Sequence, residues 1–193
     1  MTSLPRAPAP KLDPREEHVR LPSPHPNLSL FLRHLAPEAP NGKAVLYVHG
    51  GTFPSALAFA HRFDGQSWRD ALCRAGFDCW GLDFHGFGAF SDPYPEMAEP
   101  AERHAPLGRA EAASRQLEAA IRFIAARQGA TRLSLIAHSW GSIVAGRLAG
   151  RCPELVERLV FFAPIARRAP GGERTRLPAW RLISLRDQWD RFT

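Results

Sequence analysis

Cysteine is scarce in this 193-residue sequence, and its odd number leaves at least one thiol without a partner. Cys73, Cys79 and Cys152 also lack the close spacing of a metal site. A sparse and odd set argues against a disulfide framework and favours a reducing compartment, so we expect a cytoplasmic protein. None of the three has sequence neighbours that would activate a thiol, and we expect them to be buried for packing.

Long apolar runs are also missing. No stretch of the sequence is long and apolar enough to span a bilayer, which argues against a membrane protein. The segment Met1–Lys11 contains no apolar run of the kind found in secretory signals. We therefore expect no association with a membrane.

Lysine is nearly absent, since only Lys11 and Lys43 occur, and arginine carries almost all of the formal charge of +6. The arginines are scattered along the chain instead of clustered, so we expect no nucleic-acid partner. The sequence has no H-x-x-x-H pattern, no pair of carboxylates at ligand spacing and no glycine-rich phosphate loop. We therefore expect neither a metal nor a cofactor.

Composition divides the chain into three segments. Prolines crowd residues 1–16, at positions 5, 8, 10 and 14, and predict a flexible, extended arm. Residues 17–170 contain the apolar runs of a single globular core. Residues 171–193 are interpreted as the start of a helical lid or cap. Their large apolar residues could share one helix face: Trp180, Leu182, Ile183, Leu185 and Trp189.

Within the core, strand-like runs alternate with helix-like segments. Strands are predicted over 17–21, 28–35, 43–48, 77–82, 133–136 and 159–163, and helices over 67–75, 109–128 and 143–149. This alternation predicts an α/β fold with a mostly parallel sheet and helices on both faces. The alternating pattern of residues 28–35 is typical of an antiparallel strand near a sheet edge.

Two of these segments carry more detailed expectations. In the helix over 67–75, one apolar face is predicted, formed by Trp68, Ala71, Leu72 and Ala75. The strand over 159–163, L-V-F-F-A, is apolar and is predicted to lie at an exposed sheet edge. An unpaired apolar edge favours association with another chain.

Polar and small residues follow three of the predicted strands. His49-Gly50-Gly51 follows residues 43–48, Asp83-Phe84-His85-Gly86 follows 77–82, and Ala137-His138-Ser139-Trp140-Gly141 follows 133–136. Ligand sites in open α/β sheets lie beyond the carboxyl ends of the strands, so we expect the three motifs to converge. Ala137 and Gly141 are small enough for a sharp turn that presents the Ser139 hydroxyl beside a helix N-terminus.

In this order, the three motifs resemble those of the α/β-hydrolase family over about residues 28–165. L-Y-V-H-G-G is similar to the oxyanion-hole strand, G-L-D-F-H-G-F-G to the turn after the next strand, and A-H-S-W-G to the nucleophile elbow, usually G-x-S-x-G. The resemblance implies that Ser139 is the nucleophile of an esterase-like serine hydrolase. It also implies that the N–H groups of Gly51 and Trp140 bind the oxyanion, with Thr52 as a substitute for Gly51.

The elbow residue also suggests a substrate class. Dehalogenase-like and epoxide-hydrolase-like members of the family carry aspartate there, so serine favours a small-molecule acyl substrate such as an ester, lactone, thioester or amide. Three histidines are candidates for the base at this edge, namely His49, His85 and His138, and each could instead orient a loop by hydrogen bonds. Asp83 is expected to cap a turn.

The family places its acid and its histidine after the serine, yet no histidine follows His138 in this sequence. Asp187 and Asp190 are the candidate acids. We therefore expect a chain truncated before the last strands of the fold, which lacks the usual acid and histidine and hydrolyses esters slowly or not at all.

Two alternatives to an esterase remain open. One is a non-catalytic, α/β-hydrolase-like binding or interaction protein, which the missing histidine favours. The other is a prolyl-iminopeptidase-like aminopeptidase. The H-G-G and S-W-G-S motifs are similar to those of that group, whereas Thr52-Phe53 and D-F-H-G differ from them.

Overall fold

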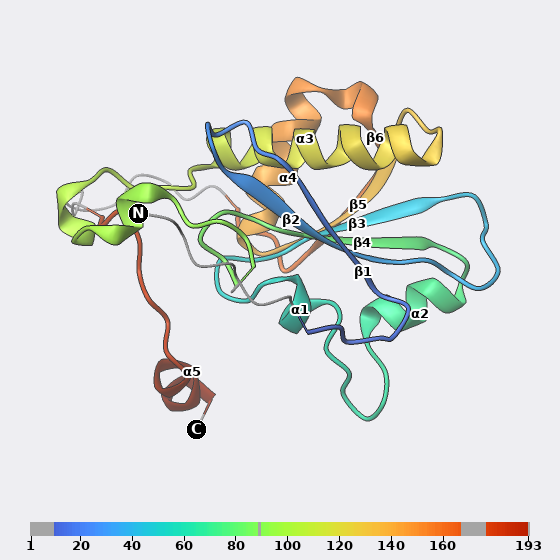
Figure 1. The fold of residues 1–193 in the computed structure, drawn as a ribbon, viewed down its shortest axis with the longest axis horizontal. Coiled ribbons are helices and arrows are strands. Elements are labelled where there is room, and N and C mark those ends of the chain that lie inside the picture. The colour runs from blue at the N-terminus through green and yellow to red at the C-terminus, as the bar shows by residue number, and fades with distance from the viewer. Residues whose placement is uncertain (1–9, 89, 167–176, 193) are drawn as a thin grey trace.

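The computed structural model describes residues 10–88, 90–166 and 177–192 (Figure 1). Within them, six strands form one sheet in the order β1-β2-β4-β3-β5-β6. The strands are β1 (Glu17–Pro22), β2 (Ser29–Leu35), β3 (Ala44–Val48), β4 (Asp78–Asp83), β5 (Leu133–His138) and β6 (Val156–Phe162). The last four run parallel to one another, whereas β2 is antiparallel to both β1 and β4. The mostly parallel sheet and the antiparallel strand over 28–35 are thus confirmed.

Helices cover both faces of this sheet, as predicted. α1 (Ser55–Ala58) and α2 (Trp68–Arg74) lie on one face, and α3 (Ala110–Gln128) and α4 (Trp140–Arg151) lie on the other (Figure 1). The 3₁₀ helices are η1 (Pro95–Ala98), η2 (Ala101–Arg103) and η3 (Pro153–Leu155), and α5 (Leu185–Phe192) lies apart from the sheet. None of the helices in the described ranges combines the length and the apolarity that a bilayer crossing requires.

The larger part of the core lies between the sheet and α3. The apolar stripe of this helix is buried at Ala113, Leu117, Ala120, Ile121 and Ile124. It packs in one cluster with Leu46 of β3, Trp80 of β4 and Leu135 of β5. The helix ends at Gly129, whose φ of +62° is the left-handed conformation that glycine adopts without strain. This packing fixes β3, β4 and β5, whose carboxyl ends carry the three motifs.

The buried face of α2 differs from the predicted apolar face. Trp68 is 45% exposed, whereas Arg69, Asp70 and Cys73 are buried. Asp70 forms a reciprocal capping box with Ser67 at the start of the helix, and its carboxylate also accepts hydrogen bonds from Arg62. Burial of Arg69 and Asp70 is tolerated because each is paired with an opposite charge, Arg69 with Glu16 and Asp70 with Arg62, which offsets the cost of desolvation.

The described end of the predicted arm, residues 10–16, packs against the core through Asp13 and Glu16. Glu16 is fully buried, and its carboxylate accepts hydrogen bonds from Arg33 at 2.5 Å and from Arg69 and His18. Asp13 accepts a hydrogen bond from Arg62 at 2.7 Å. Buried ion pairs thus hold Asp13 and Glu16 against the rest of the chain, and the flexibility of the arm stays a prediction. Residues 1–9 lie outside the described part of the chain.

The described tail contains a shorter helix than the one predicted. Residues 180–183 are not helical, and α5 begins after Ser184. The Ser184 hydroxyl accepts the N–H of Asp187 at 3.1 Å, and the Asp187 carboxylate accepts the N–H of Ser184 at 2.8 Å. This reciprocal pair sets the start of the helix and engages one of the two candidate acids in capping. Residues 171–176 of the predicted lid lie outside the described residues.

β6 lies at one end of the sheet and, among the described strands, pairs with β5 alone. The exposed fractions of Val160, Phe161 and Phe162 are 54%, 45% and 48%. The predicted apolar edge over 159–163 is therefore present, within a strand that begins three residues earlier, at Val156. Association through this edge stays a prediction.

Candidate active site

Ser139 occupies a sharp turn between β5, which ends at His138, and α4, which begins at Trp140. Its φ of +51° and ψ of −118° belong to a region that non-glycine residues rarely adopt. The Ser139 N–H donates to the carbonyl of Phe162 at 3.0 Å, and its own carbonyl accepts the N–H of Ser142 at 3.0 Å. These two bonds hold a strained residue in place, and the sharp strand-to-helix turn predicted for this segment is present.

Small residues on either side of Ser139 permit the turn. A Cβ atom added to Gly141 would lie 2.5 Å from the carbonyl oxygens of both Val48 and His49. Ala137 is fully buried and pairs in register with Val48 of β3 and Phe161 of β6. The end of β3 and the start of α4 are therefore in direct contact, and the loop after β3 is brought to the turn.

The loop formed by Gly50 and Gly51 passes beside Ser139. A Cβ atom on Gly50 would lie 3.2 Å from Ser139 Cβ, and one on Gly51 would lie 3.6 Å from Trp140 Cβ. Within the described residues, the N–H groups of Gly51 and Trp140 have no hydrogen-bond acceptor. The two donors that the resemblance assigns to the oxyanion are thus unpaired and beside the turn.

The hydroxyl of Ser139 is available for chemistry. Ser139 is half-buried, and its Oγ makes no hydrogen bond to any described residue. It adjoins the N-terminus of α4, where unpaired N–H groups and the helix dipole favour negative charge. A free hydroxyl beside unpaired donors suits attack on a carbonyl carbon, because negative charge then develops on the carbonyl oxygen.

His49, a candidate base, has both ring nitrogens engaged elsewhere. Its Nδ1–H donates to the carbonyl of Gly50 at 2.6 Å, and its Nε2 accepts the N–H of Phe84 at 3.2 Å. The two bonds define this tautomer. The side chain is fully buried, and this desolvation lowers its pKa. His49 therefore stays neutral and joins two loops, and it leaves no ring nitrogen for Ser139.

His85 is likewise engaged by other residues. Its Nε2 accepts a hydrogen bond from the hydroxyl of Ser23 at 2.7 Å, and its Nδ1–H donates to the carbonyl of Asp92 at 2.8 Å. Its backbone N–H donates to the side-chain oxygen of Gln116 at 3.2 Å. Burial lowers the pKa of His85 as well. The ring holds the segment around Ser23 against the loop after β4, so this histidine too has no free nitrogen.

His138 differs from the other two histidines. Its ring makes no hydrogen bond within the described residues and packs against Phe162, with the ring centroids 5.2 Å apart. A Cβ atom on Gly50 would lie 3.1 Å from His138 Nδ1, so the imidazole and Ser139 flank the same point of the loop. Partial burial lowers its pKa. Of the three candidate bases, His138 is the one with free ring nitrogens beside Ser139.

Asp83 caps a turn, as predicted. Its buried carboxylate accepts the backbone N–H of Ser55, at the start of α1, at 2.6 Å. Asp83 therefore ties the end of β4 to the helix that follows β3. Within the described ranges, no group of three or more histidine, cysteine, aspartate or glutamate side chains is placed to hold a metal.

Ser142 is a site residue that sequence reasoning missed. Its hydroxyl donates to the carbonyl of Ser139 at 2.5 Å and accepts the N–H of Ile165 at 3.1 Å. It therefore binds the turn to the segment that follows β6. The available signal was its position in the first turn of a helix, where serine hydroxyls bond to a carbonyl three or four residues earlier.

Comparisons with known proteins place this geometry in a family. Residues 39–187 match the family model described as serine aminopeptidase, S33. A search among curated proteins gave no match. Among solved structures, the chain is similar to a probable hydrolytic enzyme from Pseudomonas aeruginosa, at 29% identity and a TM-score of 0.54, over 78% of this chain and 41% of that one.

Two further structures show the same fold. An epoxide hydrolase from Vigna radiata is 20% identical, with a TM-score of 0.58, over 81% of this chain and 42% of that one. A proline iminopeptidase-related protein from Thermus thermophilus is 25% identical, with a TM-score of 0.53, over 78% of this chain and 45% of that one. The chain thus spans less than half the length of these structures. Because the family model covers most of the chain, from before β3 to within α5, the chain belongs to the serine aminopeptidase S33 family of α/β-hydrolases.

Proposed function

We propose that this α/β-hydrolase acts on a carboxylic ester or a similar small acyl substrate through Ser139. The observation that carries the proposal is the backbone of Ser139, held at a φ of +51° between β5 and α4 with its hydroxyl free. Strained non-glycine residues persist where the surrounding structure over-determines them, and they cluster at functional sites. The small residues Gly50 and Gly141 let the loop after β3 approach this turn closely.

The chemistry follows from the groups around the hydroxyl. Ser139 Oγ attacks the carbonyl carbon of the substrate and transfers its proton to a base, which forms a tetrahedral intermediate. The N–H groups of Gly51 and Trp140 are free to bind the oxygen that becomes negative. In the collapse of the intermediate the base gives its proton to the leaving oxygen, which expels the alcohol and leaves an acyl-serine. Water then hydrolyses the acyl-serine, which releases the carboxylic acid and restores the Ser139 hydroxyl.

The base that accepts the Ser139 proton is one of the three candidate histidines. Since the ring nitrogens of His49 and His85 are bonded elsewhere, we assign the role in this chain to His138. Its lowered pKa supports the assignment, because a base must be unprotonated at neutral pH. No carboxylate bonds to this ring among the described residues, so His138 is not oriented as it would be in a triad.

An aminopeptidase is the second candidate. The family model is described as a serine aminopeptidase, and one similar structure is proline iminopeptidase-related. The H-G-G and S-W-G-S motifs favour it, and the differences at Thr52-Phe53 and D-F-H-G count against it. An aminopeptidase would use the same serine and oxyanion donors on an amide bond. For either activity we propose a cytoplasmic location, because all three cysteines are free thiols.

The test is acylation of the purified chain, followed by intact mass and peptide mapping. A fluorophosphonate or an activated acetate ester is expected to modify Ser139, and the Ser139→Ala variant is expected to stay unmodified. Ser134→Ala is the matched control, because Ser134 is a half-buried serine of β5 outside the turn, and it should be modified like the parent. A proline anilide that is cleaved faster than the ester would favour the aminopeptidase. If neither reagent modifies Ser139 in the folded chain, the non-catalytic alternative holds.

A further inference from the structure

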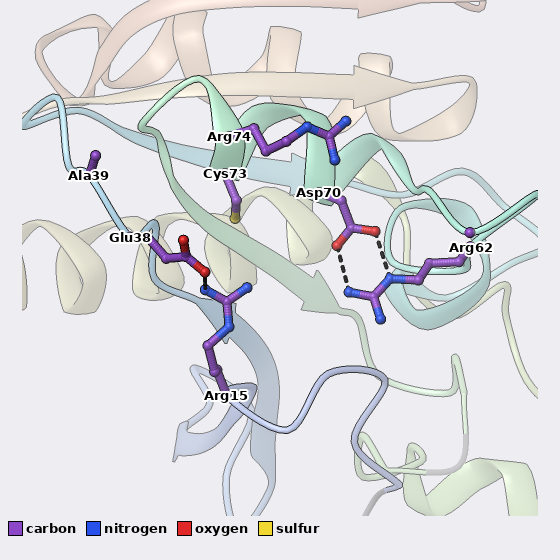
Figure 2. A pocket seen from close by; sticks show the side chains of 8 residues that line it. Arg15, Glu38, Ala39, Arg62, Asp70, Cys73 and Arg74 are labelled. Atoms are coloured by element: carbon purple, nitrogen blue, oxygen red, sulfur yellow. Dashed lines mark hydrogen bonds and ion pairs between the residues drawn. The ribbon is translucent and has the colours of Figure 1, made fainter.

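A second candidate site lies at the opposite edge of the sheet from Ser139. A cavity of about 420 Å³ opens where β2 and α2 end and β4 begins, and it is lined by Arg15, Glu38, Ala39, Arg62, Gly65, Asp70, Cys73 and Arg74. Figure 2 shows that the sulfur of Cys73 points toward the ion pair of Arg15 with Glu38. The cavity therefore brings a thiol and three guanidinium groups together, and the hydrolytic chemistry uses none of them.

The cations around this cavity differ in how they are paired. Arg62 is bound by Asp70 and Asp13, both at 2.7 Å. Arg15 pairs through Nε with the buried Asp13 at 3.2 Å and through Nη1 with Glu38 at 3.0 Å. The Glu38 side chain is 87% exposed, so a competing carboxylate can replace Glu38 at little cost while Asp13 stays bound. Arg74 has no ionic or hydrogen-bonded partner among the described residues. The mouth of the cavity thus offers two guanidinium groups to an anionic ligand.

The thiol in this cavity has a second thiol behind it. Cys73 Sγ donates to the carbonyl of Leu35 at 3.4 Å, and Leu35 is paired with Cys79 in the register of β2 and β4. Both cysteines belong to one apolar cluster, and Cys79 Sγ donates to the carbonyl of Arg69 at 3.7 Å, one helical turn before Cys73. Cys79 is fully buried, whereas Cys73 lines the cavity. A reagent in the cavity therefore meets Cys73 first.

The electrostatic surroundings of the two thiols also favour reaction at Cys73 before Cys79. The neighbouring Cys79 thiol and the positive charges of Arg69 and Arg15 lower the pKa of Cys73, against the opposing effect of burial. The same contact and burial raise the pKa of Cys79. Thiolate, the reactive form, is therefore concentrated at Cys73.

We propose that Cys73 is a modification site for small disulfides that carry carboxylates, with Cys79 as the resolving thiol. The Cys73 thiolate attacks one sulfur of the ligand, the ligand S–S bond breaks, and one ligand thiolate leaves and takes a proton from water. Cys79 then attacks Cys73 Sγ and its proton passes to the second ligand sulfur, which leaves as a thiol, so that a Cys73–Cys79 disulfide remains. One ligand disulfide is reduced to two thiols, and two protein thiols are oxidised.

The experiment treats the whole chain with glutathione disulfide, whose carboxylates outnumber its ammonium groups, and in parallel with the dication cystamine. Peptide mapping after an acid quench is expected to find the Cys73–Cys79 disulfide, with Cys152 still reduced. Cys152 is the internal control because it is equally buried, at 8% exposure, and does not line the cavity. The rate with glutathione disulfide divided by the rate with cystamine is expected to be about tenfold larger in the folded chain than in the chain unfolded by urea.

Variants separate the steps. Cys79→Ser should stop at a mixed disulfide on Cys73, Cys73→Ser should leave Cys79 reduced, and Arg74→Gln should remove most of the preference for the anionic reagent. Arg74 is exposed, so this variant is expected to fold, and urea unfolding checks that all the variants do. Equal rates for Cys73 and Cys152, equal rates for the two reagents, modification of Cys79 in Cys73→Ser, or reaction only in urea would each overturn the proposal.

Discussion

The imidazole of His49 accepts the backbone N–H of Phe84 at Nε2, over 3.2 Å, and so joins the loop after β3 to the end of β4. The bond requires a neutral ring. Protonation would place a second donor opposite the N–H of Phe84, and the buried charge would have no solvent. Desolvation accordingly lowers the pKa of His49 from its ordinary 6.5.

This relationship predicts a loss of stability in mild acid. The pKa of His49 is lower in the folded than in the unfolded state, so unfolding takes up a proton between the two values. The contribution of this histidine leaves the free energy of unfolding unchanged above about pH 6.5. Below that pH the free energy of unfolding decreases, by up to about 1.4 kcal/mol per pH unit for this histidine. His85, also buried with a lowered pKa, acts in the same direction.

Urea unfolding from about pH 8 to about pH 5 measures this slope, in a range where carboxylates are still ionised in both states. His49→Gln should reduce the slope, whereas His61→Gln should leave it unchanged because His61 is exposed. Equal slopes for the parent and His49→Gln would contradict the assignment of a neutral His49.

Gly141→Ala should destabilise the fold. The added Cβ would lie 2.5 Å from two backbone oxygens, those of Val48 and His49, so the start of α4 or the end of β3 must move. We expect a loss of about 2 kcal/mol or more in the free energy of unfolding. Gly150→Ala, in the same helix with nothing within 4 Å of the new Cβ, should be neutral or stabilising by up to about 1 kcal/mol. Similar unfolding curves for the two variants would show that the contact can relax.

Glu16→Gln should be among the most destabilising substitutions on the chain. Burial would raise the pKa of Glu16, but hydrogen bonds from Arg69 and His18 and the nearby positive charges lower it, so the carboxylate is ionised. Loss of its charge leaves Arg33 and Arg69 buried without a counter-ion, at a cost of about 3–5 kcal/mol. Glu38→Gln removes an exposed carboxylate and should cost less than about 1 kcal/mol. Thermal unfolding of the two variants side by side tests this difference.

Catalytic turnover by the 193-residue chain should be slow. Without an oriented acid and histidine, enzymes of this type retain roughly 10³–10⁴-fold over water from the oxyanion donors and binding. Hydrolysis of a short activated ester measures the rate, with Ser139→Ala beside the parent. Turnover at ordinary enzyme rates that vanishes in this variant would refute the expectation, and His138→Ala would then be the first variant to assay.

The exposed edge of β6 should cause association that depends on concentration. Among the described strands, β6 is paired on one side only, and the exposed Val160, Phe161 and Phe162 lie on this edge strand. Val160→Lys should lower the average mass seen by light scattering at high concentration, because a charged edge resists pairing. Leu182→Lys, at a residue that is 77% exposed away from the sheet, is the control and should have a smaller effect. A monodisperse monomer in the parent chain would remove the basis for this prediction.

Features with a local cause could be predicted from the sequence. The apolar stripe of α3 and its end at Gly129 depend on residues within one helix, and the turn at Ser139 depends on small residues two positions away. The convergence of the three motifs could also be predicted, because each follows a strand and parallel strands end at the same edge of a sheet.

Features whose partners are distant along the chain could not be predicted. Ser23 and His85 are 62 residues apart, and Glu16 and Arg69 are 53 residues apart. A carboxylate that follows a proline-rich stretch gives no local sign that two arginines will surround it. The same holds for the buried face of α2, where Arg69 pairs with Glu16 and Asp70 pairs with Arg62, both outside the helix.

The hydrogen bond from the Ser139 N–H to the Phe162 carbonyl makes Ser139 the last hydrogen-bonded residue of the β5–β6 pair. An edge strand frays more readily than a central one, because it is held from one side. If β6 peels away from its Phe162 end, the first bond to break is the one that fixes the backbone of Ser139. The preorganisation of the elbow therefore depends on how firmly the edge is held, and a strand or protein that docks along β6 would tighten the geometry of Ser139 without touching it.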